Sequence, residues 1–206
     1  MQPFQRLTAI ACPLPFANID TDQLIPARFM KRSRAEGYGG YLLHDMRFAD
    51  DGAERVDFPL NRPEFKNAQI VVARRNFGAG SSREAAVYAL VDYGIRCVVA
   101  PSFGDIFASN AVNNGLLPAR VDESQAEVLI RMLENGVAKL SVDLDAQTIT
   151  ASEMSIPFHV DPVWRMKLLN GWDDIDLTLS QTDAIARFTA EDAGRRPWAV
   201  PQSPSR

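Results

Sequence analysis

The chain has 206 residues with 46% apolar and 23% charged content, which is the composition of an ordinary globular protein with one sizeable core. Its formal net charge of −4 and its lack of a long basic block argue against nucleic acid as the main partner. No apolar run approaches the roughly 20 residues of a membrane span. Met1 to Phe4 form no charged and apolar leader, so a cytoplasmic protein with no membrane partner is expected.

The first informative stretch runs from Cys12 to Pro26, where several prolines exclude a helix interior. Asp20 and Asp22 stand at alternate positions in it. In an extended backbone the two carboxylates share one face, which suits the acidic edge of an active site. As turn residues they would only cap their own backbone. The sequence leaves both interpretations open.

A second stretch, residues 28–40, is basic at its start and glycine-rich at its end. This pattern predicts a mobile flap that brings an arginine to an anionic ligand, and a solvated basic loop is the alternative. Residues 45–66 follow with an irregular pattern and several turn signals, which predicts a long excursion over the surface.

The central motif joins an apolar run of strand length, Gln69 to Ala73, to an apolar helix that ends at Gly94. Between them lies the polar, glycine-rich stretch from Asn76 to Glu84. A helix that begins at Ser81 brings free backbone N–H groups, two serine hydroxyls and a guanidinium together at its positive end. The motif therefore predicts a site for an anion, most naturally a carboxylate held bidentately by Arg83.

A purely structural explanation of this motif also exists. Ser81 and Glu84 have the spacing of a capping box, in which each side chain only satisfies a backbone amide. The stretch lacks the lysine of a phosphate-binding loop and does not form the Gly-x-Ser-x-Gly turn of serine hydrolases. Local pattern alone thus indicates an anion site and no particular reaction.

The second half of the chain alternates between strand and helix patterns. Strands are predicted at 96–100 and 116–119, a hairpin at 139–151 and a further strand at 155–160. Helices are predicted at 105–112, 124–135, 163–170 and from about 181 to 193. This order indicates an α/β fold with a mixed sheet or partly closed barrel flanked by helices. Residues 195–206 are rich in Pro and Ser and are predicted to be a disordered tail, which leaves 1–194 as one domain.

The chain has only two cysteines, Cys12 and Cys97, which lie far apart in the sequence. They cannot form a zinc or iron-sulfur site alone, and a disulfide is not expected in a reducing compartment. Cys97 is predicted to be a buried strand residue. No metal site and no cofactor of its own are therefore expected in this chain.

Several motifs in a fixed order carry a resemblance to a known family. They are Asn18-Ile19-Asp20-Thr21-Asp22-Gln23-Leu24-Ile25-Pro26, Asn76-Phe77-Gly78-x-Gly80-Ser81-Ser82-Arg83-Glu84, Ala100 to Phe107, Asn113 to Pro118, and Leu177-Thr178-Leu179 before Asp183-Ala184-Ile185. Together they resemble the small subunit of bacterial 3-isopropylmalate dehydratase, in the aconitase superfamily, from about Phe4 to Glu191.

The resemblance implies a swivelling β/β/α domain that closes over a separate large subunit, in a heterodimer or heterotetramer. That partner is implied to carry a 4Fe-4S cluster on its own cysteines, whose iron acts as Lewis acid on the leaving hydroxyl. The implied substrate is a small dicarboxylic hydroxy acid, and the implied reaction interconverts 2-isopropylmalate and 3-isopropylmalate by dehydration and rehydration in leucine biosynthesis.

The resemblance also implies roles for five residues of this chain. By similarity to aconitase, Ser81 is the base that exchanges the proton on carbon, and Arg83 with the backbone around Ser82 holds a substrate carboxylate. Asp22 and Arg34 complete the site, Asp22 as a catalytic and Arg34 as a substrate-binding residue. A serine is a poor base at neutral pH, so its oxyanion needs the positive field of the helix start and the arginines.

Two departures from the family pattern bear on the substrate. The family usually has Cys where this chain has Ala79, and His where it has Ala85. Arg34 also stands in a variant setting, so Arg32 is the alternative arginine of the flap. A paralogous protein of the same type that acts on 2-methylmalate or dimethylmalate is the alternative function within the superfamily.

Two other classes of function are weaker. A hydrolase would pair Ser81 or Ser82 with His44 or His159, but a lone histidine is more often a scaffold residue than a base. A binding-only module that regulates a partner is the third hypothesis, motivated by the missing Cys and His.

Overall fold

The computed structural model describes residues 1–199 and shows one mixed sheet of seven strands in the order β4-β3-β2-β1-β5-β6-β7. Strands β1 to β4 run parallel, and β5, β6 and β7 continue antiparallel from β1. The strands are β1 (Arg6–Leu14), β2 (Ile70–Ala73), β3 (Cys97–Ala100), β4 (Leu117–Arg120), β5 (Lys139–Asp143), β6 (Thr148–Ala151) and β7 (Met154–Pro157).

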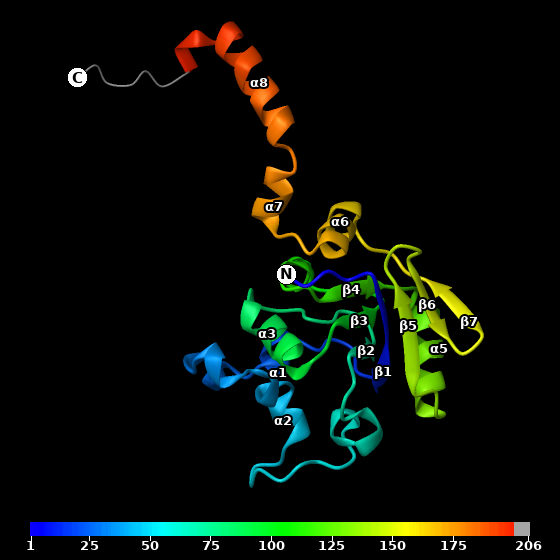
Figure 1. Ribbon diagram of the computed structural model, residues 1–206. Helices are drawn as coiled ribbons and strands as arrows, with labels where there is room; N and C mark the ends of the chain where they lie inside the picture. Colours follow the sequence, from blue (N-terminus) through cyan, green and yellow to red (C-terminus); the bar gives the residue numbers. More distant parts are fainter. Residues whose placement is uncertain (200–206) are drawn as a thin grey trace.

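The helices are α1 (Thr21–Leu24), α2 (His44–Arg47), α3 (Glu84–Tyr93), α4 (Asp105–Asn113), α5 (Glu123–Glu134), α6 (Pro162–Asn170), α7 (Asp174–Leu179) and α8 (Thr182–Arg195). Of these, α3, α4 and α5 connect β2 to β3, β3 to β4 and β4 to β5, whereas α7 and α8 follow the last strand and extend away from the sheet (Figure 1). Short 3-10 turns lie at Ala27–Lys31, Arg34–Glu36, Gly39–Tyr41, Pro59–Asn61, Pro63–Phe65 and Pro197–Ala199. None of the helices formed by residues 1–199 is both long and apolar enough to cross a membrane.

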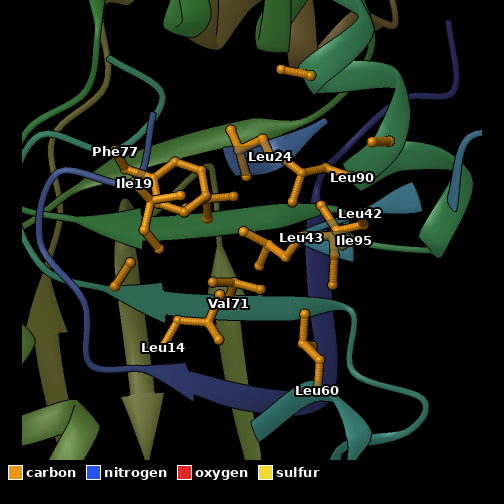
Figure 2. Packing of buried hydrophobic residues seen from close by; sticks show 14 of the residues in the cluster. Leu14, Ile19, Leu24, Leu42, Leu43, Leu60, Val71, Phe77, Leu90 and Ile95 are labelled. Atoms are coloured by element: carbon orange, nitrogen blue, oxygen red, sulfur yellow. The ribbon is translucent and has the colours of Figure 1, made fainter. Parts of the chain in front are cut away.

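The parallel strands are buried on both faces, so their side chains alternate between two cores. Val71 and Val98 point into the first core with Leu90 of α3 and with residues from the long segment between β1 and β2. Figure 2 shows this core around Val71, where Leu14, Leu24, Leu42, Leu43 and Ile95 also gather. Ile70 and Val72 point into the second core, which contains Leu129 of α5.

The sheet curls until its two ends nearly meet. His159, just after β7, exchanges two backbone hydrogen bonds with Arg120 at the end of β4, with N···O distances of 2.7 and 3.0 Å. This single bridge brings the antiparallel end of the sheet to its parallel end around the second core. The predicted α/β fold with a mixed, partly closed barrel is thereby confirmed.

Most predicted elements of the second half are present, and several other segments differ from the prediction. β1 was not predicted as a strand, and α7 was not predicted as a helix. The predicted surface excursion at 45–66 contains α2 and two 3-10 turns and buries Phe58, Leu60 and Phe65 in the first core. Of the tail predicted from 195 onward, Arg195 ends α8 and Pro197–Ala199 forms a turn. Residues 200–206 lie outside the described residues.

Candidate functional site

Three loops leave the same edge of the sheet, because β1, β2 and β3 are parallel and each loop follows the carboxyl end of its strand. This edge is where ligands bind in many open α/β sheets. The loops are residues 15–20 with α1, residues 74–83, which we name the central loop, and residues 101–104. The sequence motifs at Asn18, at Asn76 to Glu84 and at Ala100 to Phe107 thus converge in space.

Backbone hydrogen bonds join the central loop to both neighbours. On the first loop the bonds run from Asn18 N to Arg75 O at 2.9 Å, from Gly78 N to Ile19 O at 2.7 Å and from Thr21 N to Ala79 O at 2.8 Å. On the third loop they run from Phe77 N to Ser102 O at 3.0 Å and from Gly104 N to Phe77 O at 2.9 Å. The central loop is therefore joined by backbone hydrogen bonds to a neighbouring loop on each side, as an inner strand of a sheet is.

Two asparagines of these loops adopt left-handed backbone conformations, Asn18 with φ 58° and Asn76 with φ 62°. Asparagine tolerates this region better than most residues. Their side chains bond one another, with Asn76 Nδ2 donating to Asn18 Oδ1 at 2.9 Å. Paired residues in a sparsely populated conformation are typical of a functional loop.

Gly78 is required by two constraints at once. Its φ is 71°, and a Cβ there would lie 2.2 Å from the ring of Phe107 in α4. Phe107 in turn packs edge-on against Phe77, with ring centroids 5.4 Å apart. The central loop therefore lies directly on an aromatic support, and no larger residue fits at this position.

The end of the central loop differs from the sequence prediction. Helix α3 begins at Glu84, and Arg83 is its N-cap in an extended conformation with no side-chain capping bond. The prediction that the helix begins at Ser81 is wrong, and so is the capping-box alternative. Ser81 and Ser82 stay exposed in the loop, just before the positive end of α3. Among residues 1–199 no capping role accounts for these two hydroxyls.

Asp22 and Arg83 form an ion pair between α1 and the central loop. The side chain of Arg83 is 21% exposed and that of Asp22 is 55% exposed, so the pair sits at the rim of the site. Asp20 instead caps α1, with Gln23 N donating to its carboxylate at 2.7 Å. The extended interpretation of this stretch is therefore wrong, the capping interpretation holds for Asp20, and Asp22 is free to face Arg83.

Thr21, between the two aspartates, was not singled out in the sequence. Its side chain is buried, and its hydroxyl donates to the backbone carbonyl of Ser81 at 3.1 Å. Thr21 thereby fixes the backbone that carries the serine. Its position between two aspartates gave no signal of this role, because a threonine in a turn is common.

In this structure Arg34 of the flap contacts two side chains of α3. The Arg34 guanidinium lies 3.2 Å from Asp92 Oδ1 and 3.7 Å from the ring centroid of Tyr88, both on α3. The Tyr38 backbone N–H also donates to Asp92, at 3.1 Å. Partial burial, with the neighbouring Glu84 carboxylate, raises the pKa of Tyr88, which keeps its hydroxyl neutral. The assignment of Arg34 to the substrate stays a prediction.

The alternative arginine of the flap is also occupied, since Arg32 pairs with Glu36 at 3.4 Å on the surface. Arg28 begins the flap and pairs with Asp45. The Arg28 guanidinium lowers the pKa of Asp45 to about 2. The flap is thus attached to the body at both ends, by Arg28 at its start and by Arg34 and Tyr38 toward its end.

The two histidines do not support the hydrolase alternative. His44 lies beside Arg28 and Asp45 and against the ring of Phe29. His159 pairs through its backbone with Arg120 at the closing bridge of the sheet. Among residues 1–199 no hydrogen bond joins either imidazole to Ser81 or Ser82.

The two departures from the family pattern occupy different surroundings. Ala79 is half-buried, and its backbone bridges to Asp20 across the two loops. Ala85 is in the first turn of α3 and packs against the first core. Ala79 therefore borders the site directly, whereas Ala85 faces at least partly inward.

The fold and this edge of loops define a member of the aconitase C-terminal domain class, whose family model matches residues 1–124. Two further models match, LeuD_N over 129–162 and the C-terminal domain of the 3-isopropylmalate dehydratase small subunit over 174–202. The chain belongs to the family of 3-isopropylmalate dehydratase small subunits.

Individual relatives agree with this placement. The chain is 50% identical to the 3-isopropylmalate dehydratase small subunit of Rhodospirillum centenum, over 97% of this chain and 100% of the relative. It is 50% identical to the protein of the same name from a Jannaschia species, over 96% of this chain and 100% of the relative. The solved structure of 3-isopropylmalate dehydratase from Methanocaldococcus jannaschii is similar in fold, with a TM-score of 0.62 and 23% identity over 88% of this chain and 98% of that one.

Proposed function

We propose that this chain is the small subunit of a hydro-lyase that interconverts 2-isopropylmalate and 3-isopropylmalate, acting only together with a large subunit. The observation that supports this most is the geometry of the central loop. Two exposed serines there precede an arginine at the positive end of α3, and the arginine faces an aspartate from a second loop. No name among the relatives above favours the methylmalate alternative.

In this proposal the guanidinium of Arg83 binds one carboxylate of the substrate. A planar fork suits a carboxylate, and Asp22 holds the guanidinium at the rim of the site before substrate arrives. The backbone around Ser82 supplies further hydrogen-bond donors. Binding therefore requires the substrate carboxylate to share or replace the contact that Asp22 makes with Arg83.

Ser81 is proposed to exchange the proton on the substrate carbon. An alkoxide is unfavourable at neutral pH, so the hydroxyl needs nearby positive charge. Arg83 and the N-terminal end of the ten-residue helix α3 supply that field. Thr21 fixes the Ser81 backbone through the 3.1 Å bond to its carbonyl, which limits the movement of the serine during the reaction.

The residues of this chain do not fit an iron-sulfur cluster. Cys12 and Cys97 are both buried and belong to opposite cores of the sheet, and burial raises the pKa of each thiol. Residues 1–199 contain no group of three or more His, Cys, Asp or Glu side chains placed to hold a metal ion. The proposal therefore assigns the 4Fe-4S cluster to the large subunit.

The substrate is proposed to be a diacid with a branched alkyl group. Ala79 borders the site with a methyl group, which offers no polar contact to a third carboxylate. One small alkyl group is distinguished from another by only about 1 to 3 kcal/mol in an apolar pocket. Overlapping activity on smaller methyl-substituted malates is therefore expected.

The test is turnover by the complex with its large subunit. The values of kcat/KM for 3-isopropylmalate, 2-methylmalate and citrate should be compared, with the isolated chain as the control that shows no turnover. A preference for 3-isopropylmalate supports the proposal. A strong preference for 2-methylmalate selects the paralogue, and a preference for citrate or no turnover of any diacid refutes the assignment.

A further inference from the structure

Residues 174–199 form an arm that projects from the body of the protein. It consists of α7, α8 and the turn Pro197–Ala199, and Figure 1 shows both helices extending away from the sheet. Neither helix has a buried residue. The arm therefore contributes little to either core of the sheet.

The arm carries large apolar side chains on faces that no described residue covers. In α7, Ile175 and Leu179 are 69% and 62% exposed, and in α8, Ile185 and Phe188 are 47% and 58% exposed. Spacings of four and three residues place each pair on one side of its helix. Trp198, at the end of the arm, is 79% exposed. Such a concentration of exposed apolar residues typically marks an interaction surface.

Several hydrogen bonds hold the start of the arm, which we call its root, against the body of the protein. Lys167 of α6 is buried, and its ammonium bonds Asn113 of α4 and Asp174, the first residue of α7, the latter at 2.6 Å. The amino group of Met1 donates to Gly171 O at 2.8 Å just before the arm. Asp173 completes a capping box that starts α7. The arm thus leaves the body from a fixed point.

An isolated helix of the length of α8 is only marginally stable in water, because helix stability in proteins comes mainly from packing of one face. A fixed root together with an uncovered apolar face therefore indicates that a partner completes the packing. The body does not need the arm, since both faces of its sheet are already covered.

We propose that the apolar face of this arm docks into an apolar groove on the large subunit, as an amphipathic helix in a groove. The inference rests on the proposed function, which supplies the partner. The aconitase-type match ends at residue 124, whereas the arm coincides with a match described as belonging to dehydratase small subunits. The arm is thus an addition to the aconitase-like part in a protein that must assemble from separate chains.

The test compares two double variants of the full chain. Ile185→Ser with Phe188→Ser removes the apolar face of α8. Asp183→Ser with Arg187→Ser is the control, because helical periodicity places both residues on the opposite side and the pair leaves net charge unchanged. Far-UV circular dichroism of each isolated chain shows whether the body stays folded. Affinity for the purified cognate large subunit is then measured by isothermal titration calorimetry without substrate.

The proposal predicts at least a tenfold rise in Kd for the apolar-face variant and less than a twofold change for the control. Equal affinity of all three chains overturns it, and so does equal weakening by both variants. A third outcome would also overturn the proposal: the isolated chain self-associates, only the apolar-face variant abolishes this self-association, and binding to the large subunit stays intact. That outcome would show that a second copy of this chain covers the arm. Because association is measured without substrate, a chain that binds normally but has no turnover refutes the proposed function and leaves the docking inference standing.

Discussion

The guanidinium of Arg83 is bound to the carboxylate of Asp22, although 61 positions separate the two residues in the chain. Both side chains remain partly exposed, so the pair contributes only about 0.2 to 1 kcal/mol to stability. We assign the pair a role in orientation, because it holds a planar donor at the edge where three loops meet. Asp22 and Arg83 thus prepare the site that we assign to the substrate carboxylate.

Replacing Arg83 with Lys should weaken substrate binding and rate together. An ammonium keeps the charge but cannot form two parallel hydrogen bonds to a carboxylate. Loss of one charged hydrogen bond, about 1.5 to 3 kcal/mol, corresponds to a fall of about 10- to 150-fold in kcat/KM of the complex. Arg75→Lys is the matched control, since Arg75 pairs with Glu123 on the surface at 2.9 Å. Equal effects of the two substitutions would contradict the role of Arg83.

Replacing Asp92 with Ala should loosen the flap without unfolding the protein. Asp92 holds the flap through Arg34 and through the Tyr38 backbone, and loss of about 1 kcal/mol of local stabilisation raises the opening equilibrium about fivefold. Trypsin cleavage after Lys31, Arg32 and Arg34 should accelerate to this extent, while the melting temperature stays nearly constant.

The control for the flap is Glu36→Ala, which removes only the exposed pair with Arg32. Its cleavage rate should stay near that of the wild type. An unchanged rate in the Asp92 variant would show that the flap is held by other contacts.

Replacing Gly78 with Ala should strongly destabilise the fold. The left-handed φ of 71° costs a residue with a Cβ about 1 to 2 kcal/mol, and the clash with Phe107 adds overpacking of about 1 to 3 kcal/mol. Urea unfolding should therefore show a loss of about 2 to 5 kcal/mol. Gly40→Ala is the control, because a Cβ there meets nothing within 4 Å and its φ is not positive. A loss in the Gly78 variant no larger than in this control would refute the packing of the central loop on Phe107.

Both cysteines should be unreactive in the native protein at pH 8. Burial raises the pKa of the Cys12 and Cys97 thiols, so the thiolate that attacks a disulfide reagent is scarce as well as inaccessible. Titration with Ellman's reagent should detect no fast thiol in the folded chain and two after denaturation. One rapidly reacting thiol in the native protein would contradict this burial.

The sequence predicted the elements whose pattern is local. β2 and β3 are short apolar runs, and α5 combines a capping aspartate, Asp122, with a clear apolar face. The sequence did not predict β1, because Pro13 lies inside it and Pro15 follows it, and proline is rare within strands. The curl of the sheet also could not be predicted, since it depends on the bridge between Arg120 and His159.

In the candidate site, too, some features could be predicted from the sequence and others could not. Ser81 and Arg83 lie in one motif and could be named from sequence, and Asp22 followed from a second motif and the family resemblance. The contact between Arg34 and Asp92 could not be predicted from the sequence, because two charged residues 58 positions apart look like any pair of solvated side chains. Lys167 gave no signal either, since a lysine in a helix is expected at the surface and this one is buried.

The most direct test of the account is turnover of 3-isopropylmalate by the complex that carries Ser81→Ala, with Ser82→Ala as the control. If Ser81 exchanges the proton on carbon, kcat falls by about 100-fold or more, the scale of general acid–base catalysis, while KM changes only a few fold. The control keeps most of its activity, because the backbone at Ser82 is unchanged. A Ser81 variant that turns over at the wild-type rate would contradict the account.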